Sequence, residues 1–341
     1  DIWVEPTIVI AALNDTICDN TPTNILVKRA NTTTICILFT WTVTDNPNVE
    51  GESNSTGDGQ LNGTAIIQTL DNTSTDAQLV QYTITPWTNK RDGHNSCSGP
   101  PITVDIWVEP TVVIAALNDT ICDNTPTNIL VNSANTTTNG IRYTWTVTDN
   151  PNLEGESNST GDGQLNGTAI IQTLDNTSAV AQLVQYTITP WTINNNGNNE
   201  CSGTPITVDI WVEPTVVITA LSDTICDNTP TNILVNSANT TTNGIRYTWT
   251  VTDNPNVEGE SNSTGDGQLN GTAIIQTLDN TSTDAQLVQY TITPWSINNN
   301  GDNECSGTPI TVDIWVEPTV VITALSDTIC DNTPTNILVN S

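Results

Sequence analysis

The sequence predicts an all-β protein, a row of antiparallel β-sandwich domains arranged as a rod. Three observations predict this fold class. The segment DIWVEPT begins at residues 1, 105, 209 and 313, so the chain repeats every 104 residues. Each repeat contains short runs in which apolar and polar residues alternate, which is the pattern of a half-buried β-strand. No segment combines a helical period of apolar residues with helix-capping residues.

The repeat length indicates one folded domain per repeat. A unit of 104 residues is longer than a solenoid repeat and long enough to bury a core of its own. The second and third copies are nearly identical, whereas the first is divergent. We therefore divide the chain into three complete repeats and a partial fourth that holds only its first two strands, at 1–104, 105–208, 209–312 and 313–341.

The strands of one repeat follow in order along the second copy. The sequence predicts six or seven of them, at 111–117, 128–133, 141–148, within 149–168, 169–174, 182–189 and 205–212. Clusters of Asn, Gly, Pro and Asp separate the strands, among them Asn166-Gly167, a signal for a two-residue hairpin. This number of short alternating strands in about 100 residues is typical of an immunoglobulin-type sandwich.

The alternation also predicts which side chains are buried. Ile141, Tyr143 and Trp145 share one face of the third strand, with Trp145 as its core tryptophan. In the last strand, by contrast, a tryptophan falls on the outward face beside a Glu-Pro linker. We expect these outward side chains to pack against the next domain, and the alternative is an exposed platform for sugar rings. They are Trp107, Trp211 and Trp315.

Composition and charge exclude several classes of function. Six Lys and Arg residues stand against 37 Asp and Glu, which gives a net charge of −31. Binding to nucleic acid or to anionic membranes depends on basic side chains, so we expect neither partner. No apolar run is long enough to cross a bilayer, so we expect no direct membrane insertion. His94 is the only histidine and no catalytic motif occurs, so we expect no enzyme.

One acidic stretch is a candidate calcium site. TDNPNVEGESNSTGDGQLNG places four carboxylates close together in sequence, at Asp45, Glu50, Glu52 and Asp58. Calcium takes six to eight oxygen ligands, which such a loop can supply, although the spacing is not that of an EF-hand. A solvated acidic loop is the alternative. Calcium is the only cofactor that the sequence leaves open.

The cysteines recur at two places in the repeat, one before the second strand and one before the last. Pairing within a repeat, Cys122 with Cys201, conflicts with an immunoglobulin topology. The loops that carry the two residues lie at opposite poles, roughly 30 Å apart by strand length, whereas a disulfide tolerates about 7 Å between Cα atoms. Stacked domains bring these loops together across a junction, so we favour Cys18–Cys201 and Cys122–Cys305.

Two further cysteine pairings remain open. The additional Cys36 of the first repeat falls at the same pole as Cys97, so these two form a third candidate pair. A turn at the Glu-Pro linker would instead allow Cys97 to pair with Cys122. Disulfides of either kind fit an exported protein.

The order of segments resembles that of a known family. ICDNTPTNILVNS, YTWTV, GTAIIQTLDNTS, VQYTITP and CSGTPITVDIWVEP follow one another as in the PKD-like immunoglobulin-type domains of Bacteroidota surface proteins. Those domains form long tandem arrays in giant adhesins, including the mobile adhesin of gliding motility, which the type 9 secretion system exports. The resemblance implies an extracellular location at the bacterial cell surface and brings no catalytic residues.

The same resemblance implies a modification. Asp-Thr-Ile recurs once per repeat and resembles the acceptor motif for O-linked glycans in Bacteroidota, with an ordinary loop threonine as the alternative. The acceptor residues would be Thr16, Thr120, Thr224 and Thr328. Asn-x-Ser/Thr triplets such as Asn72-Thr73-Ser74 also occur, although an Asn- and Thr-rich chain produces them by chance.

The function that follows is a structural one, with neighbouring copies of the same domain as the main partners. We expect a stalk or filament segment of a cell-surface adhesin that supplies reach and mechanical continuity without catalysis. One alternative is a self-assembling extracellular filament subunit, whose partial fourth repeat completes the sheet of another chain. Another is an array that binds calcium or glycans weakly at each repeat and gains avidity from repetition.

Overall fold

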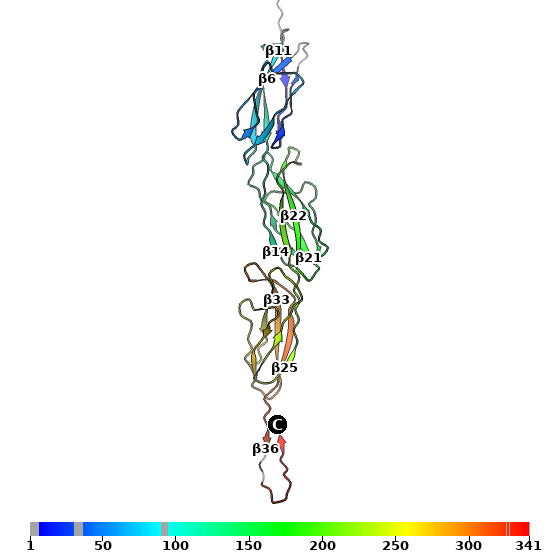
Figure 1. Ribbon diagram of the computed structural model, residues 1–341, viewed down its shortest axis with the longest axis vertical. Helices are drawn as coiled ribbons and strands as arrows, with labels where there is room; N and C mark the ends of the chain where they lie inside the picture. The colour runs from blue at the N-terminus through cyan, green and yellow to red at the C-terminus, as the bar shows by residue number, and fades with distance from the viewer. Residues whose placement is uncertain (1–6, 31–36, 90–94, 325, 327, 341) are drawn as a thin grey trace, which may run out of the picture.

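The computed structural model describes residues 7–30, 37–89, 95–324, 326 and 328–340. Three β-sandwich domains follow one another end to end as a rod, and a short hairpin extends beyond the third (Figure 1). Every regular element of the described residues is a β-strand. None of those residues forms a helix suited to crossing a membrane. The all-β fold class, with tandem sandwiches in a row, is as predicted.

The larger sheet of the second domain carries the elements that reach both neighbours. Its strand order is β14 (Asp119–Ile121), β24 (Ile206–Val212), β22 (Gln182–Ile193), β17 (Ile141–Val147) and β19 (Gln164–Leu165), and β23 (Asn199–Ser202) also pairs with β22. Strand β22 is longer than predicted, since it continues to Ile193 and pairs there with β23. This extension forms a hairpin at one pole of the domain.

The second layer consists of shorter strands. One sheet contains β15 (Thr125–Pro126), β21 (Thr173–Asn176) and β18 (Leu153–Glu154), and another contains β16 (Ile129–Leu130) and β20 (Ala169–Ile170). The predicted turn at Asn166-Gly167 connects β19 to β20, which belong to different sheets. It is therefore a corner between the two layers and not a hairpin.

Strand β14 was not predicted from the sequence. It has three residues, which is too few to show an alternating pattern, and it pairs in parallel with β24. The first strand of the sandwich is thereby split. Ala115 pairs with Asn132 in the second layer, whereas Asp119–Ile121 crosses to the larger sheet. The segment read as a loop is an edge strand.

The core lies between the two layers and follows the predicted alternation. Tyr143, Trp145, Tyr186 and Val208 are buried in one hydrophobic cluster that extends from Val112 to Val212. Trp145 donates its indole N–H to the carbonyl oxygen of Ser157 at 2.9 Å, so its one polar atom is satisfied inside the sandwich. The first and third domains have equivalent clusters, Ile8–Val108 and Val216–Val316.

These clusters correct the domain boundaries. Strand β13 (Ile102–Val108) belongs to the first sandwich and crosses the predicted boundary between 104 and 105. The folded units therefore meet at Glu109-Pro110 and again at Glu213-Pro214, five residues after each period boundary. The length of the repeat equals the length of the folded unit, but each predicted boundary lies five residues too early. The reason is that DIWVEP contains the end of one domain and the link to the next.

The partial fourth repeat forms the two strands expected of it. Strands β36 (Thr323–Ala324) and β37 (Val339–Asn340) pair in antiparallel register. Val320 and Ile322 of this hairpin are largely exposed, whereas the equivalent Val216 and Ile218 are buried in the third domain. The difference arises because a sandwich buries these side chains under its later strands.

A buried asparagine joins the end of each sandwich to the loop that meets the next domain. In the second domain, the Asn176 amide donates to the carbonyl oxygens of Val212 and Val180, each at 2.9 Å. Its side-chain oxygen accepts hydrogen bonds from the N–H and hydroxyl of Ser178 at 3.0 and 2.8 Å. Asn72 and Asn280 make the same set of bonds.

Replacement of this asparagine by alanine in every repeat should destabilise each domain by about 2 kcal/mol, because buried carbonyl groups lose their donors. The midpoint of urea unfolding measures the effect. The matched control replaces exposed asparagines at one other repeated position and should change the unfolding free energy by less than about 0.5 kcal/mol. Equal midpoints for the two variants would contradict the role assigned to the buried amide. The test positions are Asn72, Asn176 and Asn280, and the control positions are Asn48, Asn152 and Asn256.

Candidate functional site at the domain junctions

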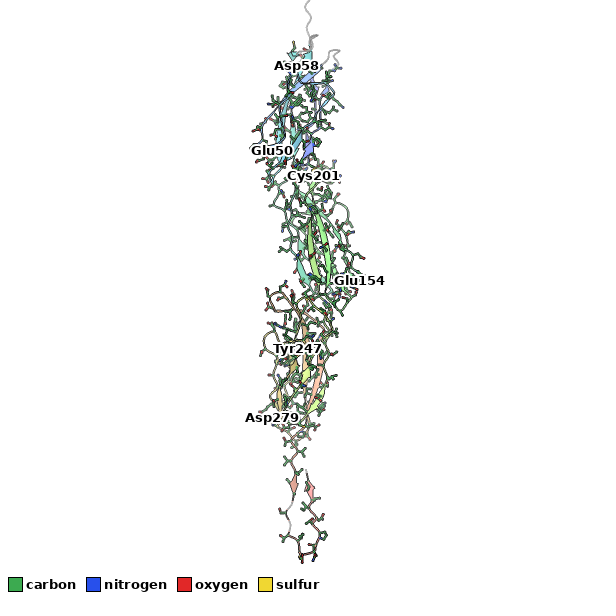
Figure 2. All side chains as sticks on the ribbon, in the orientation of Figure 1. Glu50, Asp58, Glu154, Cys201, Tyr247 and Asp279 are labelled. Carbon is green, nitrogen blue, oxygen red and sulfur yellow. A yellow bond between two sulfur atoms is a disulfide. The ribbon has the colours of Figure 1, made fainter. Side chains whose placement is uncertain are left out.

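Two disulfides join neighbouring domains. Cys18, directly after β2 (Asp15–Ile17) of domain one, bonds to Cys201 in β23 of domain two, and Cys122 bonds in the same way to Cys305 of domain three. Their Cα atoms are 5.4 and 5.5 Å apart. Figure 2 shows Cys201 at the boundary between the first two domains. These are the two cross-domain pairs that the sequence analysis favoured.

The other cysteines are placed in part. Cys226 and Cys330 have no disulfide partner among the described residues. Cys97 is exposed in β12 (Asn95–Ser98). Its candidate partner Cys36 lies outside the described residues, as does His94. The alternatives that used Cys122 within its own repeat or with Cys97 are wrong, because Cys122 is bonded to Cys305.

Backbone hydrogen bonds form a second link at each junction. The N–H of Ala77 donates to the carbonyl oxygen of Thr136 at 2.7 Å, and the N–H of Thr136 donates to that of Thr75 at 3.1 Å. This parallel bridge recurs at the next junction between Val180 and Thr240. The loop before the sixth strand of one sandwich is thus paired, as a strand would be, with the loop before the third strand of the next.

A buried glutamate in each linker forms a third link. The Glu213 carboxylate accepts a hydrogen bond from the N–H of Thr242 in the next domain, with distances of 3.0 and 3.2 Å to its two oxygens, and another from the Thr242 hydroxyl. The backbone N–H of Glu213 donates to Ile121 of its own domain at 2.9 Å. Glu109 makes the equivalent bonds to Thr138 and Ile17. Each glutamate therefore connects both sandwiches.

The neighbouring domain is the cause of this burial. Glu109 and Glu213 are 1% and 0% exposed, whereas Glu317, which has no complete domain after it in the structure, is exposed. Burial raises the pKa of the Glu109 and Glu213 carboxyl groups, and the hydrogen bonds from Thr138 and Thr242 offset only part of this rise. The negative charge of Glu200 raises the pKa of Glu109 further.

The role of these glutamates and threonines was not predicted from the sequence. The linker glutamate recurs in each of the four VEP segments, and Thr138 and Thr242 stand at the same place in their repeats. Periodicity alone marks such residues as repeated but does not indicate a contact between repeats. The linker proline is one part of a junction that side chains on both sides also hold.

The outward tryptophans are at the junctions, but the prediction that they pack against the next domain is wrong. Trp107 and Trp211 remain 39% exposed with a complete domain after them, and Trp315 is 45% exposed without one. The following domain therefore covers little of the indole. The tryptophans instead line open clefts between the domains.

We call these two hollows the junction clefts. Their volumes are about 760 Å³ between the first and second domains and about 750 Å³ between the second and third. The second cleft is lined by Asn118, Asp119, Thr120, Val180, Ala181 and Trp211 of one domain and by Thr240–Asn243, Asn298–Asn300 and Glu304 of the next. The first is lined by the equivalent residues and also by Asp105.

The four carboxylates of the predicted calcium site do not converge. Glu50 lies near one end of the first domain and Asp58 near the other, as Figure 2 shows. Glu52 accepts a hydrogen bond from the backbone N–H of Asn46 at 3.2 Å, and Asp45 is exposed. The described part of the chain contains no group of three or more His, Cys, Asp or Glu residues placed to hold a metal ion. The predicted site does not form because residues close in sequence along this stretch, such as Glu50 and Asp58, lie far apart in the fold.

The candidate glycan acceptors differ in accessibility. Thr16 and Thr120 line the first and second junction clefts, and Thr328 is exposed in the partial repeat. Thr224 occupies the equivalent strand β25 (Asp223–Ile225) of the third domain. O-glycosylation stays a prediction. Asn72, by contrast, is buried with its amide bonded to Asp76 and Val108, which excludes an N-linked glycan on the folded chain.

Comparison with known proteins identifies the repeated unit. A family model described as a PKD-like domain matches residues 15–112, 119–216 and 223–320, which is most of the chain. No curated protein matches.

Solved structures of tandem domains are similar at low identity. Three immunoglobulin domains of titin, in an E-to-A mutated variant, give a TM-score of 0.39 at 10% identity, covering 92% of this chain and 98% of that one. The human desmocollin-1 ectodomain gives 0.32 at 8% identity, covering 95% and 62% respectively. Sidekick-1 immunoglobulin domains 1–5 give 0.31 at 9% identity, covering 91% and 58%.

The buried linker glutamate should make the stability of the junction depend on pH. Because its pKa is raised in the folded protein, Glu213 favours the folded state below the ordinary glutamate pKa, and this contribution is lost as pH rises through the raised pKa. Glu213→Gln stays neutral at every pH. We therefore expect the melting temperature of the variant, relative to the native protein, to increase between pH 4 and pH 8.

Glu317→Gln is the matched control for this measurement, since Glu317 occupies the same place in its repeat but is exposed. The control should follow the native protein across the pH range in differential scanning calorimetry. A constant offset for Glu213→Gln would show that its carboxyl group does not titrate differently in the folded and unfolded states.

Proposed function

We propose that this chain, which belongs to the family of PKD-like domains, is a stalk segment of a cell-surface adhesin that transmits tension and provides reach without catalysis. One observation carries the proposal, namely that the two disulfides interleave. Cys122 lies inside the loop closed by Cys18 and Cys201, and Cys201 lies inside the loop closed by Cys122 and Cys305. The second domain is thereby held by both bonds.

Interleaving shortens the path along which the chain can extend. With both bridges intact, the shortest covalent path runs from residue 1 to Cys18, across to Cys201, back to Cys122, across to Cys305 and on to residue 341. That path has roughly 130 residue spacings, or about 450 Å, compared with about 1,200 Å for the open chain at ~3.5 Å per residue. An array built in this way resists extension even after a domain has unfolded.

Three further features support a stalk. Each junction combines a disulfide, a two-residue β-bridge and a buried glutamate, so neighbouring domains are held at several points. The net charge of −31 opposes clumping of neighbouring molecules. Immunoglobulin-like and PKD-like repeats are typical of structural and adhesion domains, and disulfides fit an extracellular location. A Bacteroidota cell surface, with export by the type 9 system and a part in gliding, is the finer form of this proposal.

A filament subunit is the second candidate. The hairpin β36–β37 favours it, since the exposed apolar residues Val320 and Ile322 would be buried if the hairpin joined another sheet. Light scattering separates the two candidates. A stalk segment stays monomeric, with three domains of roughly 35 Å each by strand length, whereas a filament subunit grows with concentration.

Single-molecule stretching tests the interleaved arrangement. Replacement of Cys122 and Cys305 by serine should lengthen the fully extended chain by only about 90 Å. The remaining Cys18–Cys201 bridge still keeps most of the same residues out of the extended path. Reduction of every disulfide should then add about 640 Å more. This inequality arises from the overlap of the two loops.

Bridges that enclosed separate domains would give two increments of similar size. Equal increments, or an extension that reductant does not change, would overturn the proposal. A Ser237→Ala protein serves as the control for handling and attachment, since Ser237 is remote from both disulfides in sequence and should leave the extension unchanged.

A further inference from the structure

We propose that the two junction clefts bind neutral saccharides, with a sugar ring stacked on Trp107 in the first cleft and on Trp211 in the second. This binding function goes beyond that of a stalk, which requires only that the domains stay together. The proposal rests on the floor of each cleft, its walls, its charge and its repetition.

The floor of each cleft is an indole that the protein leaves uncovered. In the larger sheet, Trp211 lies between Leu183 on β22 and Thr120 on β14 and points outward. A contact surface between domains would bury such a large aromatic side chain, yet its exposure is nearly that of Trp315, which has no complete domain after it. The apolar C–H face of a pyranose ring packs well on a flat aromatic surface of this kind.

The walls offer hydrogen-bonding groups of the kind that hydroxyl-rich ligands need. Thr120 borders the floor, while Thr240, Asn298 and Asn299 come from the next domain. Amide and hydroxyl side chains both donate and accept hydrogen bonds, as sugar hydroxyls do. The Asn299 side-chain oxygen accepts a bond from the Asn243 amide at 3.0 Å, which positions its own amide group. The cleft is complete only where two domains meet.

Charge selects a neutral ligand. The lining of both clefts contains carboxylates and no Lys, Arg or His. In the second cleft, burial raises the pKa of Glu304, and the negative charges of Asp119 and Glu213 raise it further. Sialylated or sulfated sugars would meet this repulsion, whereas carboxylates accept hydrogen bonds from neutral sugars. A protein partner would need a larger apolar contact than one indole provides.

Size and repetition complete the case. Volumes of about 750 and 760 Å³ lie within the range of small-ligand sites and leave room for a short oligosaccharide. The two clefts lie one repeat apart on a rod whose junctions are fixed by disulfides. A surface that displays many copies of a glycan can therefore engage both clefts and gain avidity.

A glycan array provides the test. Labelled protein of residues 1–341, made in a host without O-glycosylation and checked by intact mass, is applied to neutral, sialylated and sulfated oligosaccharides. We expect binding to neutral members of the array. The double variant Trp107→Ala and Trp211→Ala should lose at least tenfold in signal while keeping the native melting temperature and both disulfides.

Two controls distinguish binding in the cleft from nonspecific binding to an exposed indole. Trp315→Ala removes a tryptophan of similar exposure that has no facing wall in the structure, and it should leave binding unchanged. Asn195→Ala with Asn299→Ala alters only the opposite wall and should weaken binding severalfold. The proposal is overturned if no neutral glycan binds, if only acidic glycans bind, or if binding survives loss of both cleft tryptophans. None of these results bears on the length or the disulfide linkage of the rod.

Discussion

The junctions depend on one geometric constraint, which is that each sandwich carries its two repeated cysteines at opposite poles. Strand β24 spans the domain between these poles, so the two repeated cysteines of one domain cannot bond to each other, and each takes its partner from a neighbouring domain. Once Cys122 is bonded to Cys305, the poles of the second and third domains are held together at one point. The β-bridge between Val180 and Thr240 and the bond from Thr242 to Glu213 then add further points of contact. Several contacts around one interface oppose rotation more effectively than a single flexible bond.

The linker is part of this interface and not a free tether. Proline fixes one backbone angle and restricts the residue before it, but the preceding glutamate is held by hydrogen bonds to both domains. The residue that follows the proline is held as well, since the Thr215 hydroxyl donates to Asp123 of the preceding domain at 2.5 Å. A buried carboxylate carries a desolvation cost that its hydrogen bonds offset only in part. This unfavourable contribution occurs at a position where the side chain joins two domains.

The fold could be predicted largely because the three longest strands of its larger sheet are long enough to show a period of two. Residues 141–147 and 206–212 alternate clearly, and their inward side chains are the ones found in the core. Strand β14 could not be predicted, since three residues show no period and its pairing with β24 is nonlocal. The cysteine pairs could be inferred from topology, because a covalent bond has a strict distance limit. The calcium prediction had no such limit on it, and two of its carboxylates, Glu50 and Asp58, lie near opposite ends of the domain.

Differences between the near-identical repeats reveal which junction contacts require particular side chains. Ala179-Val180 of the second domain replaces Thr75-Asp76 of the first, yet both pairs form the same bridge, because their backbone atoms make it. Thr192 becomes Ser296 in the third domain, and each hydroxyl accepts a hydrogen bond from the N–H of the bridging cysteine, at 3.1 and 3.2 Å. In contrast, the bridging cysteines, linker glutamates and threonine partners are the same at both junctions. Every junction contact pairs a residue of one repeat with a residue of the next. Each repeat carries both kinds of partner, so further repeats can be added with the same contacts. Repetition of the sequence therefore reproduces the same interface at each junction, and each added repeat also creates another cleft with its tryptophan.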